Sequence, residues 1–457
     1  MASPRTQPQP TQTPRAGAMF RALRHRNFRL FLTGAFLSNA GTWMQMVAQS
    51  WLVLQLTDSG TWLGVDNFVA TAPGLALTLV GGVIADKVDR KRLLIYTQAL
   101  AGLSALVLAL LIWTERIRWR GELRRPSDVW MVLVLTFVTG CCWALSGPSY
   151  QAITFDLVGR EDVANAVALN SSQFQLARVV GPLLAAVTIH LFGMTGCFLA
   201  NGLSYAAIVA ALSRVKFERP GAALAGGGGA GAAPPPVGAE SGGAGPSKAP
   251  AAPAAGRRSM WGDLVEAFGY VRGRPRVRAV LLCSAVVSLF GAPYIVMMPL
   301  LARNVYGWDE AGLSLMMGTA GAGALVGALT LAYLGDLRRK GLFLLGSLFL
   351  GGACITALGA AASPAAAVPV LFVTGMSMVS LFALGNTLLQ QLVRDEMRGR
   401  VMGMWILTFV GTMPFGSFLS GAASDRFGPR PVLAACGLVI LLFGLAVASR
   451  NPSLREM

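Results

Sequence analysis

Long stretches without a single Asp, Glu, Lys or Arg make up most of this 457-residue chain. They cover 30–57, 67–85, 93–114, 129–155, 163–177, 179–213, 279–302, 311–335, 341–393, 401–424 and 431–449. A helix that crosses the hydrocarbon core of a bilayer needs ~20 mostly apolar residues, and nearly every stretch is long enough. Only 13% of the chain is charged, about half the share in an ordinary soluble domain. A soluble enzyme is therefore excluded, and the sequence predicts a polytopic membrane protein.

Two regions are too long for one span and contain turn-forming residues. The first, 163–213, is expected to break at 190–196. The second, 341–393, is expected to break around Ser363, Pro364 and Pro369. Backbone groups in lipid must be hydrogen-bonded within their own segment, and these segments are too long for barrel strands. The predicted fold class is an all-α membrane protein with twelve transmembrane helices in two six-helix repeats.

The basic residues are distributed unevenly between the two faces of the predicted bundle. With the N-terminus placed in the cytoplasm, 29 of the 38 Lys and Arg lie on the inner side and eight on the outer side. This positive-inside bias predicts that both termini are cytoplasmic. The net charge of +17 therefore reflects membrane topology, and we expect no nucleic-acid partner.

A low-complexity segment separates the two sets of six spans. Of residues 221–256, 30 of 36 are Gly, Ala or Pro, which predicts a disordered linker. Apolar residues at helical spacing in 260–271 then predict an amphipathic helix on the inner membrane surface. The expected organisation is a cytoplasmic tail (1–28), a six-helix bundle (29–214), the linker with its amphipathic helix (215–278), a second bundle (279–449) and a cytoplasmic tail (450–457).

Residue types that would hold a cofactor are scarce. All six cysteines fall in predicted spans and the chain has two histidines, which favours neither a disulfide framework nor a metal cluster. The phosphate-binding pattern Gly-x-x-x-x-Gly-Lys-[Ser/Thr] does not occur, which excludes an ATP-driven pump. We therefore expect no cofactor.

A short pattern follows both span two and span eight. Asp86 and Asp336 lie 250 residues apart, and each precedes a basic cluster. Parallel six-helix repeats joined by a cytoplasmic linker are the architecture of the major facilitator type. Residues 82–92 resemble the loop between helices two and three of that superfamily, whose pattern is Gly-x-x-x-Asp-x-x-x-Arg-[Arg/Lys]. Gly82, Asp86, Arg90 and Lys91 match the pattern, and Asp89 stands where many members have Gly.

Other segments narrow the resemblance to one branch. Residues 26–56, 165–171 and 177–182 resemble the enterobactin-exporter-like proteins, also called transmembrane secretion effectors. The resemblance implies a secondary exporter of the bacterial inner membrane that works by alternating access, most simply by proton antiport. Its implied partners are the lipid bilayer, a small amphipathic substrate (a siderophore, drug or metabolite) and protons, and we expect a monomer.

The resemblance also implies a conformational latch at the inner face. Asp86 would be stabilised by the N-terminus of span eleven, near Arg400, and Arg90 would add a charge-assisted hydrogen bond in the outward-open state. The alternative is that this loop only retains the chain at the inner face. The predicted latch residues are Gly82, Asp86, Asp89, Arg90, Lys91, Asp336, Lys340 and Arg400.

Two charged residues lie inside predicted spans, Asp66 and Arg178. Each costs at least ~2.5 kcal/mol at the bilayer centre unless it faces protein or water. Our hypothesis is that Arg178 attracts an anionic group and Asp66 takes up the coupling proton; the alternative is that both are structural, paired with each other or snorkelling. The predicted cavity residues are Gln45, Gln49, Asp66, Asn170, Ser171, Gln175, Arg178, Gly181 and Pro182.

Four further interpretations concern packing and function. Gly323 and Gly327 form a Gly-x-x-x-Gly pair that favours close helix packing, and Pro293 is expected to kink span seven.

A transporter of the same fold that moves lysophospholipid stays open as an alternative function. A polytopic membrane enzyme or sensor is the other alternative, against which stands the absence of a nucleophile–base or metal constellation in the sequence.

Overall fold

The computed structural model describes residues 20–119, 125–159, 161–215, 260–335 and 337–455. Within these ranges the side chains of 76, 78–87, 260–261, 263–264 and 453–454 are not described. The predicted linker, most of the N-terminal tail and Asp336 therefore lie outside the described residues. The described part of the chain is helical and contains no strand.

The first half of the chain forms five long helices after a short 3₁₀ turn, η2 (Arg21–Arg24). They are α1 (Arg26–Thr57), α2 (Gly60–Lys87), α3 (Arg90–Trp113), α4 (Val129–Asp156) and α5 (Val163–Arg214), with a 3₁₀ turn, η4 (Pro126–Asp128), before α4. The 52-residue α5 is interrupted at Gly193, whose φ of 68° and ψ of −174° are not helical. A positive φ costs glycine little because it has no Cβ. The predicted break at 190–196 is confirmed.

The second half begins with α6 (Met260–Arg272) and a helix that changes type along its length. This helix runs from Pro275 to Val305 as α7 (Pro275–Val286), the π-helix η5 (Val287–Gly291), α8 (Pro293–Leu300) and the π-helix η6 (Leu301–Val305). The π turn η5 ends two residues before Pro293, which has no N–H to donate to a regular helical ladder. The kink expected at Pro293 stays a prediction.

The remaining helices are α9 (Glu310–Leu334), α10 (Lys340–Ala360), α11 (Pro364–Leu392), α12 (Asp395–Phe427), α13 (Pro429–Arg450) and the short α14 (Pro452–Arg455). The predicted break in 341–393 lies between α10 and α11, where the Ser363 side chain accepts a hydrogen bond from the amide of Ala366. Pro364 occupies the first turn, where a missing N–H costs nothing. Pro369, however, lies inside α11, so its part in the predicted break was wrong.

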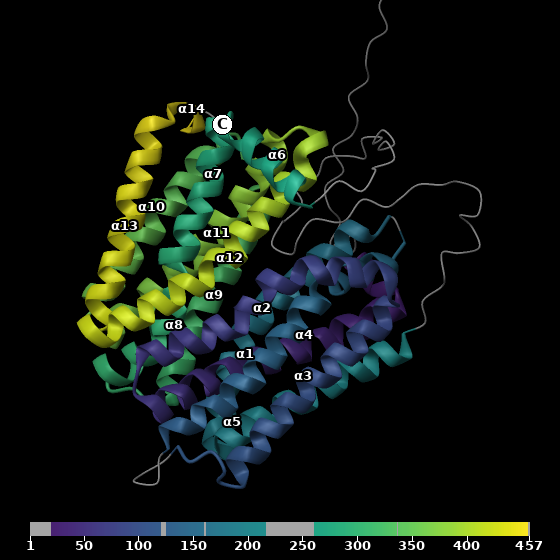
Figure 1. Cartoon of the computed structure of the whole chain (residues 1–457), viewed down its shortest axis with the longest axis vertical. Coiled ribbons are helices and arrows are strands. Elements are labelled where there is room, and N and C mark those ends of the chain that lie inside the picture. The colour runs from purple at the N-terminus through teal and green to yellow at the C-terminus, as the bar shows by residue number, and fades with distance from the viewer. Residues whose placement is uncertain (1–19, 120–124, 160, 216–259, 336, 456–457) are drawn as a thin grey trace, which may run out of the picture.

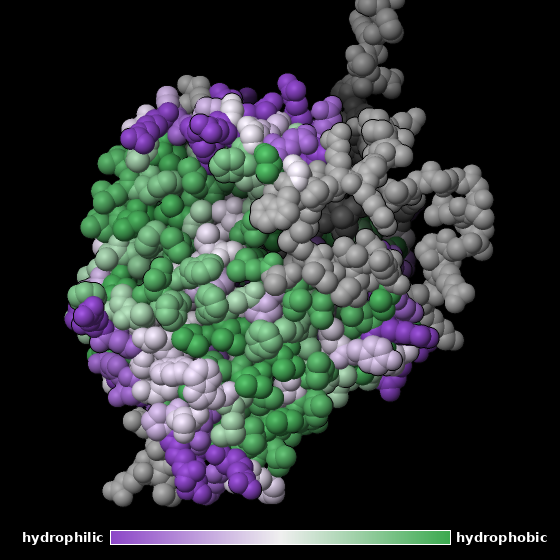
Figure 2. Space-filling model, viewed as in Figure 1, coloured by the Kyte–Doolittle hydropathy of each residue, from purple (hydrophilic) through white to green (hydrophobic). Residues whose placement is uncertain are grey.

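The surface has the character of a membrane protein. Nine helices in the described part of the chain are long and apolar enough to cross a membrane. Figure 2 shows a hydrophobic middle band with hydrophilic residues gathered at both ends. Large apolar side chains are exposed along α13, among them Leu438, Leu442 and Leu445. Water would not tolerate such a contiguous surface, whereas lipid does.

The two halves of the chain form two groups of helices that lie side by side (Figure 1). Their most extensive contacts are between α2 and α12 and between α5 and α9, and smaller ones join α1 to α8 and α9 and α2 to α8. The α2–α12 contact includes Phe68, whose ring centroid lies 5.5 Å from that of Phe415. We call the end of the bundle that carries the turn 58–61 the α1–α2 end. The opposite end, which carries α6 and α14, is the α6 end.

Glycines allow the closest helix contacts. A Cβ added at Gly323 would overlap the carbonyl oxygen of Phe372, and one at Gly327 would lie 2.7 Å from that of Met376. Both carbonyls belong to α11, so the Gly-x-x-x-Gly pair of α9 packs directly against the α11 backbone. The prediction of close packing there is confirmed.

The predicted amphipathic helix is α6. Val265 and Phe268 are exposed on it while Ala267 is fully buried. Glu266 accepts a hydrogen bond of 2.8 Å from Arg400 of α12, and the Arg274 guanidinium lies 3.7 Å from the ring centroid of Tyr270. The helix is therefore anchored on the second half and presents an apolar face outward.

Candidate functional site

A chain of polar side chains crosses the interior of the first half. Gln49 of α1 donates to both carboxylate oxygens of Asp66 on α2, at 2.9 and 3.0 Å, and approaches Thr136 of α4 at 2.9 Å. The Thr136 hydroxyl also donates to Asp66, at 3.0 Å. Two helices, α1 and α4, therefore supply the hydrogen bonds of a carboxylate on a third, α2, and a charge inside a span needs such partners.

The polar chain continues one turn along α1 and from there to α5. Gln45 donates to Gln49 at 3.3 Å, and the Asn201 amide donates to Gln45 at 2.6 Å. Asn201 lies on α5 beyond Gly193 and is almost fully buried. The structure thus joins three predicted residues (Gln45, Gln49 and Asp66) with two that the sequence reasoning missed (Thr136 and Asn201). Their signal was weak, because each is a lone polar residue in an apolar segment.

The residues predicted to form a polar face on α5 differ in their surroundings. Asn170 accepts a hydrogen bond of 3.3 Å from Gln173, which accepts one of 3.3 Å from Asn39 of α1. Ser171 and Gln175 are half-buried. Gly181 packs against α1, since a Cβ there would lie 2.6 Å from the carbonyl oxygen of Ala40. The buried Pro182 follows it, so Gly181 and Pro182 serve helix packing in this structure.

Arg178 lies where the two halves meet. Its guanidinium carbon is 5.3 Å from the ring centroid of Trp43 on α1, within the range of a cation–π interaction. Its carbonyl oxygen would lie 2.6 Å from a Cβ at Gly321 of α9. Among the described residues, the hydrogen-bond partners of Asp66 are Gln49 and Thr136, and no ion pair joins Asp66 to Arg178. The structure does not show the alternative in which these two charges pair.

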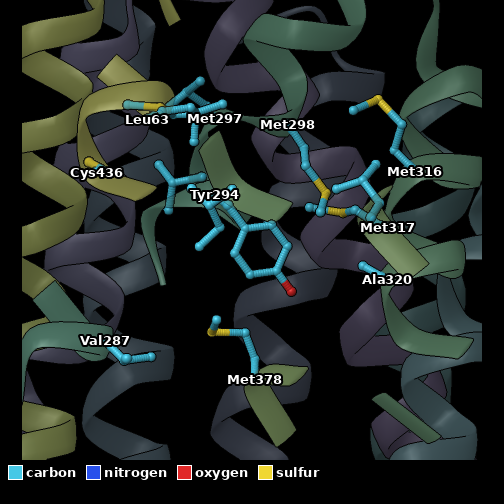
Figure 3. Packing of buried hydrophobic residues seen from close by; sticks show 14 of the residues in the cluster. Leu63, Val287, Tyr294, Met297, Met298, Met316, Met317, Ala320, Met378 and Cys436 are labelled. Carbon is cyan, nitrogen blue, oxygen red and sulfur yellow. The ribbon is translucent and has the colours of Figure 1, made fainter. Parts of the chain in front are cut away.

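A tyrosine from the second half faces Arg178. Tyr294 of α8 is only 2% exposed, and its hydroxyl lies near the guanidinium of Arg178. The hydroxyl has no hydrogen-bond partner within the described part of the chain. Figure 3 shows it directed toward Ala320, with Met298, Met317 and Met378 around the ring. Thioether side chains are flexible and polarisable, which suits them to irregular apolar shapes.

The predicted latch residues that the structure describes lie at the α6 end. The contacts described for Asp89, Arg90, Lys91 and Arg400 include ones within their own half. Arg90 is 3.5 Å from Asp156 of α4, and Lys91 donates to the carbonyls of Ser213 and Val215 at the end of α5. Asp89 caps α3 by accepting from the amides of residues 91 and 92.

Arg400 binds Glu266 of α6, as described above, and Lys340 begins α10. Gly82 and Asp86 lie near the end of α2, but their side chains are outside the described set, as is Asp336. The latch therefore stays a prediction.

The N-terminal segment is fixed at the same end. His25 and Asp162 are hydrogen-bonded at 3.0 Å, and the Ala22 amide donates to Asn165 at 2.9 Å. The hydrogen bond with His25, followed by the charge of Arg21, holds the pKa of Asp162 below its ordinary value. These contacts attach the chain before α1 to the start of α5.

Known proteins with similar sequences are named as a transporter, an exporter and an efflux protein. The family model described as "Transmembrane secretion effector" matches residues 17–226 and 248–457. The staphyloferrin A transporter of Staphylococcus aureus is 23% identical over 436 residues, 93% of this chain and 97% of the relative. The enterobactin exporter of Citrobacter koseri is 24% identical over 433 residues, 94% and 93% of the two chains. Macrolide efflux protein A of Streptococcus pyogenes is 20% identical over 380 residues, 81% and 82%.

Solved transporter structures share the fold. A transporter of the POT family, in complex with a thioalcohol-conjugated peptide, matches with a TM-score of 0.68 at 12% identity, over 94% of this chain and 96% of its own. A bacterial homologue of the human lysosomal transporter Spinster, in an inward-facing and unoccupied conformation, matches with a TM-score of 0.62 at 12% identity, over 94% and 98%. With its helical fold, its apolar surface and a family match over both halves, the chain belongs to the transmembrane secretion effectors, a branch of the major facilitator superfamily of membrane transporters.

Proposed function

We propose that this protein is a secondary exporter of a small amphipathic molecule in the bacterial inner membrane, working by alternating access and proton antiport. The names of the relatives support export of siderophores or macrolides. Twelve spans follow if α5 crosses twice, on either side of Gly193, and if α1 and α2 join the nine candidates. The organisation is then two six-helix bundles with cytoplasmic termini and a cytoplasmic linker, acting as a monomer.

The observation that carries the proposal is the hydrogen-bonded carboxylate inside the first bundle. Asp66 is held by the neutral groups of Gln49 and Thr136. A carboxylate inside a membrane span is costly while it is charged, and binding a proton removes that cost. Reversible protonation at this position would couple proton entry to the state of α1, α2 and α4.

The contacts between the halves support an inward-open state for this structure. Gly60 and Gly64 of α2 touch α12, and the α5–α9 contact lies at Arg178 and Gly318. These contacts lie from the α1–α2 end to about the middle of the helices. With cytoplasmic termini, the α1–α2 end is the outer end, and the substrate would enter from the α6 end.

Substrate-dependent proton movement tests the proposed function. Everted vesicles that contain the protein are acidified inside, and proton release is followed while siderophores, macrolides and amphipathic dyes are added in turn. Release that depends on both the protein and one of the compounds is the expected result. Silence across the whole panel would contradict export of these classes and would turn attention to lipid substrates.

The Arg178→Gln variant tests the predicted role of this cation. If Arg178 attracts an anionic group, the rate for anionic substrates should fall about tenfold or more, the loss of one charge-assisted contact. Cationic dyes of similar size should be transported at rates close to those of the wild type. An equal loss of rate for both classes of substrate would instead show that Arg178 has a structural role, in which it packs against Trp43 and Gly321.

The Asp86→Asn variant tests the inner latch. We expect a several-fold lower transport rate with normal membrane insertion, because the carboxylate would lose its charge at the N-terminus of α12 in the outward-open state. The measurement is the initial rate per inserted molecule in the same vesicles. A wild-type rate would leave the loop with only the role of retaining the chain at the inner face.

A further inference from the structure

The turn 58–61, which joins the end of α1 to the first residues of α2, is held by the other half of the chain. Asp425, in the last turn of α12, accepts hydrogen bonds from the Ser59 hydroxyl at 2.5 Å and from the Gly60 amide at 2.5 Å. It also accepts from the amide and the hydroxyl of Thr61, at 3.0 and 2.6 Å. One carboxylate therefore caps the N-terminus of α2 from a position 365 residues away in the sequence.

A cation holds the other side of the same turn. Arg303, in η6 of the second half, forms an ion pair with Asp58 and donates to the Leu54 carbonyl at 3.3 Å. Asp58 ends α1 in the left-handed conformation, with a φ of 54°. The guanidinium thus binds both the Asp58 side chain and the Leu54 carbonyl, which also accepts a 2.8 Å hydrogen bond from the Asp58 amide at the C-terminus of α1.

The signs of these charges match the helix ends. The N-terminus of a helix carries partial positive charge and stabilises an anion, while the C-terminus stabilises a cation. Asp425 is the anion at the start of α2, and Arg303 is the cation at the end of α1. Hydrogen bonds to charged groups are also among the stronger ones in proteins. Both contacts join the halves at the outer end, where they oppose separation.

The helix backbones meet at the same place. A Cβ added at Gly60 would lie 2.8 Å from the carbonyl oxygen of Gly421, and one at Gly64 would lie 2.6 Å from that of Ser417. A Cβ at Gly421 would overlap the carbonyl of Gly60. This contact between bare backbones brings Asp425 within reach of the amides of α2.

The same spacing occurs at the opposite end of this helix pair. Gly421 and Asp425 are four residues apart, and so are Gly82 and Asp86. Gly421 and Asp425 lie at the end of α12, beside the start of α2. Gly82 and Asp86 lie at the end of α2, and their predicted latch partner is the start of α12. Each helix of the pair therefore carries an aspartate suited to cap the other, at opposite ends of the bundle.

We propose that Asp425 and Arg303 form an outer clamp that holds the inward-open state, and that α2 and α12 exchange this clamp for the inner latch during transport. The inference rests on the proposed alternating access. Opening the outer end requires the α1–α2 turn to leave both charged groups. When the inner end closes, the predicted cap of α12 by Asp86 would replace the lost cap of α2 by Asp425.

Distance measurements by electron paramagnetic resonance between the halves test the clamp. Spin labels are attached at Thr114 and Ala362, which are exposed, in full-length protein whose native cysteines are replaced. For Asp425→Asn and for Arg303→Gln we expect the population with the longer, outer-open distance to rise about five- to tenfold. Ser59→Ala with Thr61→Val removes two of the hydroxyl donors and should shift the distribution in the same direction with less risk to folding.

A matched control separates the clamp from a general effect of charge. Asp309 lies at the same end and caps α9 in its own half, accepting from the Gly312 amide at 3.0 Å. Asp309→Asn should leave the distance distribution unchanged. The proposal is overturned if the clamp variants retain the wild-type distribution, or if Asp309→Asn shifts it equally. The readout needs no substrate, so a failure of the clamp and a failure of the proposed export are seen in different experiments.

Discussion

Replacing Asp66 with asparagine is expected to abolish substrate-triggered proton release while the protein still inserts and folds. Asparagine keeps the size of the side chain and can still bond to Gln49 and Thr136, but it cannot bind and release a proton in the working pH range. We expect proton release per inserted molecule to fall at least about 100-fold, as for loss of an essential proton carrier. The measurement is the everted-vesicle assay with the substrate that gives the largest wild-type signal.

Asp309→Asn is the control for this variant as well. It removes a carboxylate that caps α9 and lies outside the polar chain, so it should retain near wild-type proton release. Thr136→Val, which removes one hydrogen bond from Asp66, should give an intermediate rate. Full proton release by Asp66→Asn would move the coupling site to another residue and leave export itself in place.

We expect Gly323→Ala to lower the stability of the fold more than any other substitution that adds a single carbon atom. The new Cβ would overlap the carbonyl oxygen of Phe372, and a backbone group cannot rotate away as a side chain can. Separating α9 from α11 would also loosen the reverse contact, in which Gly375 packs against the carbonyl of Ala320. We expect a loss of about 1–3 kcal/mol of stability, measured as a lower melting temperature in detergent by size-exclusion chromatography after heating.

Gly346→Ala provides the matched control. Gly346 lies in α10 and is exposed, with nothing within 4 Å of a Cβ built there. The same substitution should be neutral or slightly stabilising, because alanine is preferred over glycine in helices by about 1 kcal/mol. Equal melting temperatures for the two variants would mean that α9 and α11 can separate at little cost.

The helices follow from local properties of the sequence, and most were predictable for that reason. Apolar length decides whether a segment can cross a membrane, and the backbone must then be helical. The break in α5 needed a glycine at a positive φ, and Gly193 lies where a turn was expected. Pro369 misled the prediction because proline near the start of a helix is tolerated, and only the path of the chain at Ser363 shows where α11 begins.

The candidate site was only partly predictable. Gln45 and Gln49 are one turn apart and so share a helix face, which sequence alone can show. Their partners Thr136 and Asn201 belong to other helices and are single polar residues among apolar ones. The face that such a residue presents to a neighbour depends on how several helices pack together, which no local pattern contains.

By itself the sequence determined the membrane class, the helical fold, the charge bias and the family, because each is carried by composition or by a short motif. Only the tertiary structure decided which groups meet: Asp66 with Thr136, Arg178 with Trp43, and Asp425 with the start of α2. In lipid the apolar faces of helices have no hydrophobic reason to prefer one neighbour over another. Small residues and hydrogen bonds select the partners, and those contacts join residues far apart in the chain.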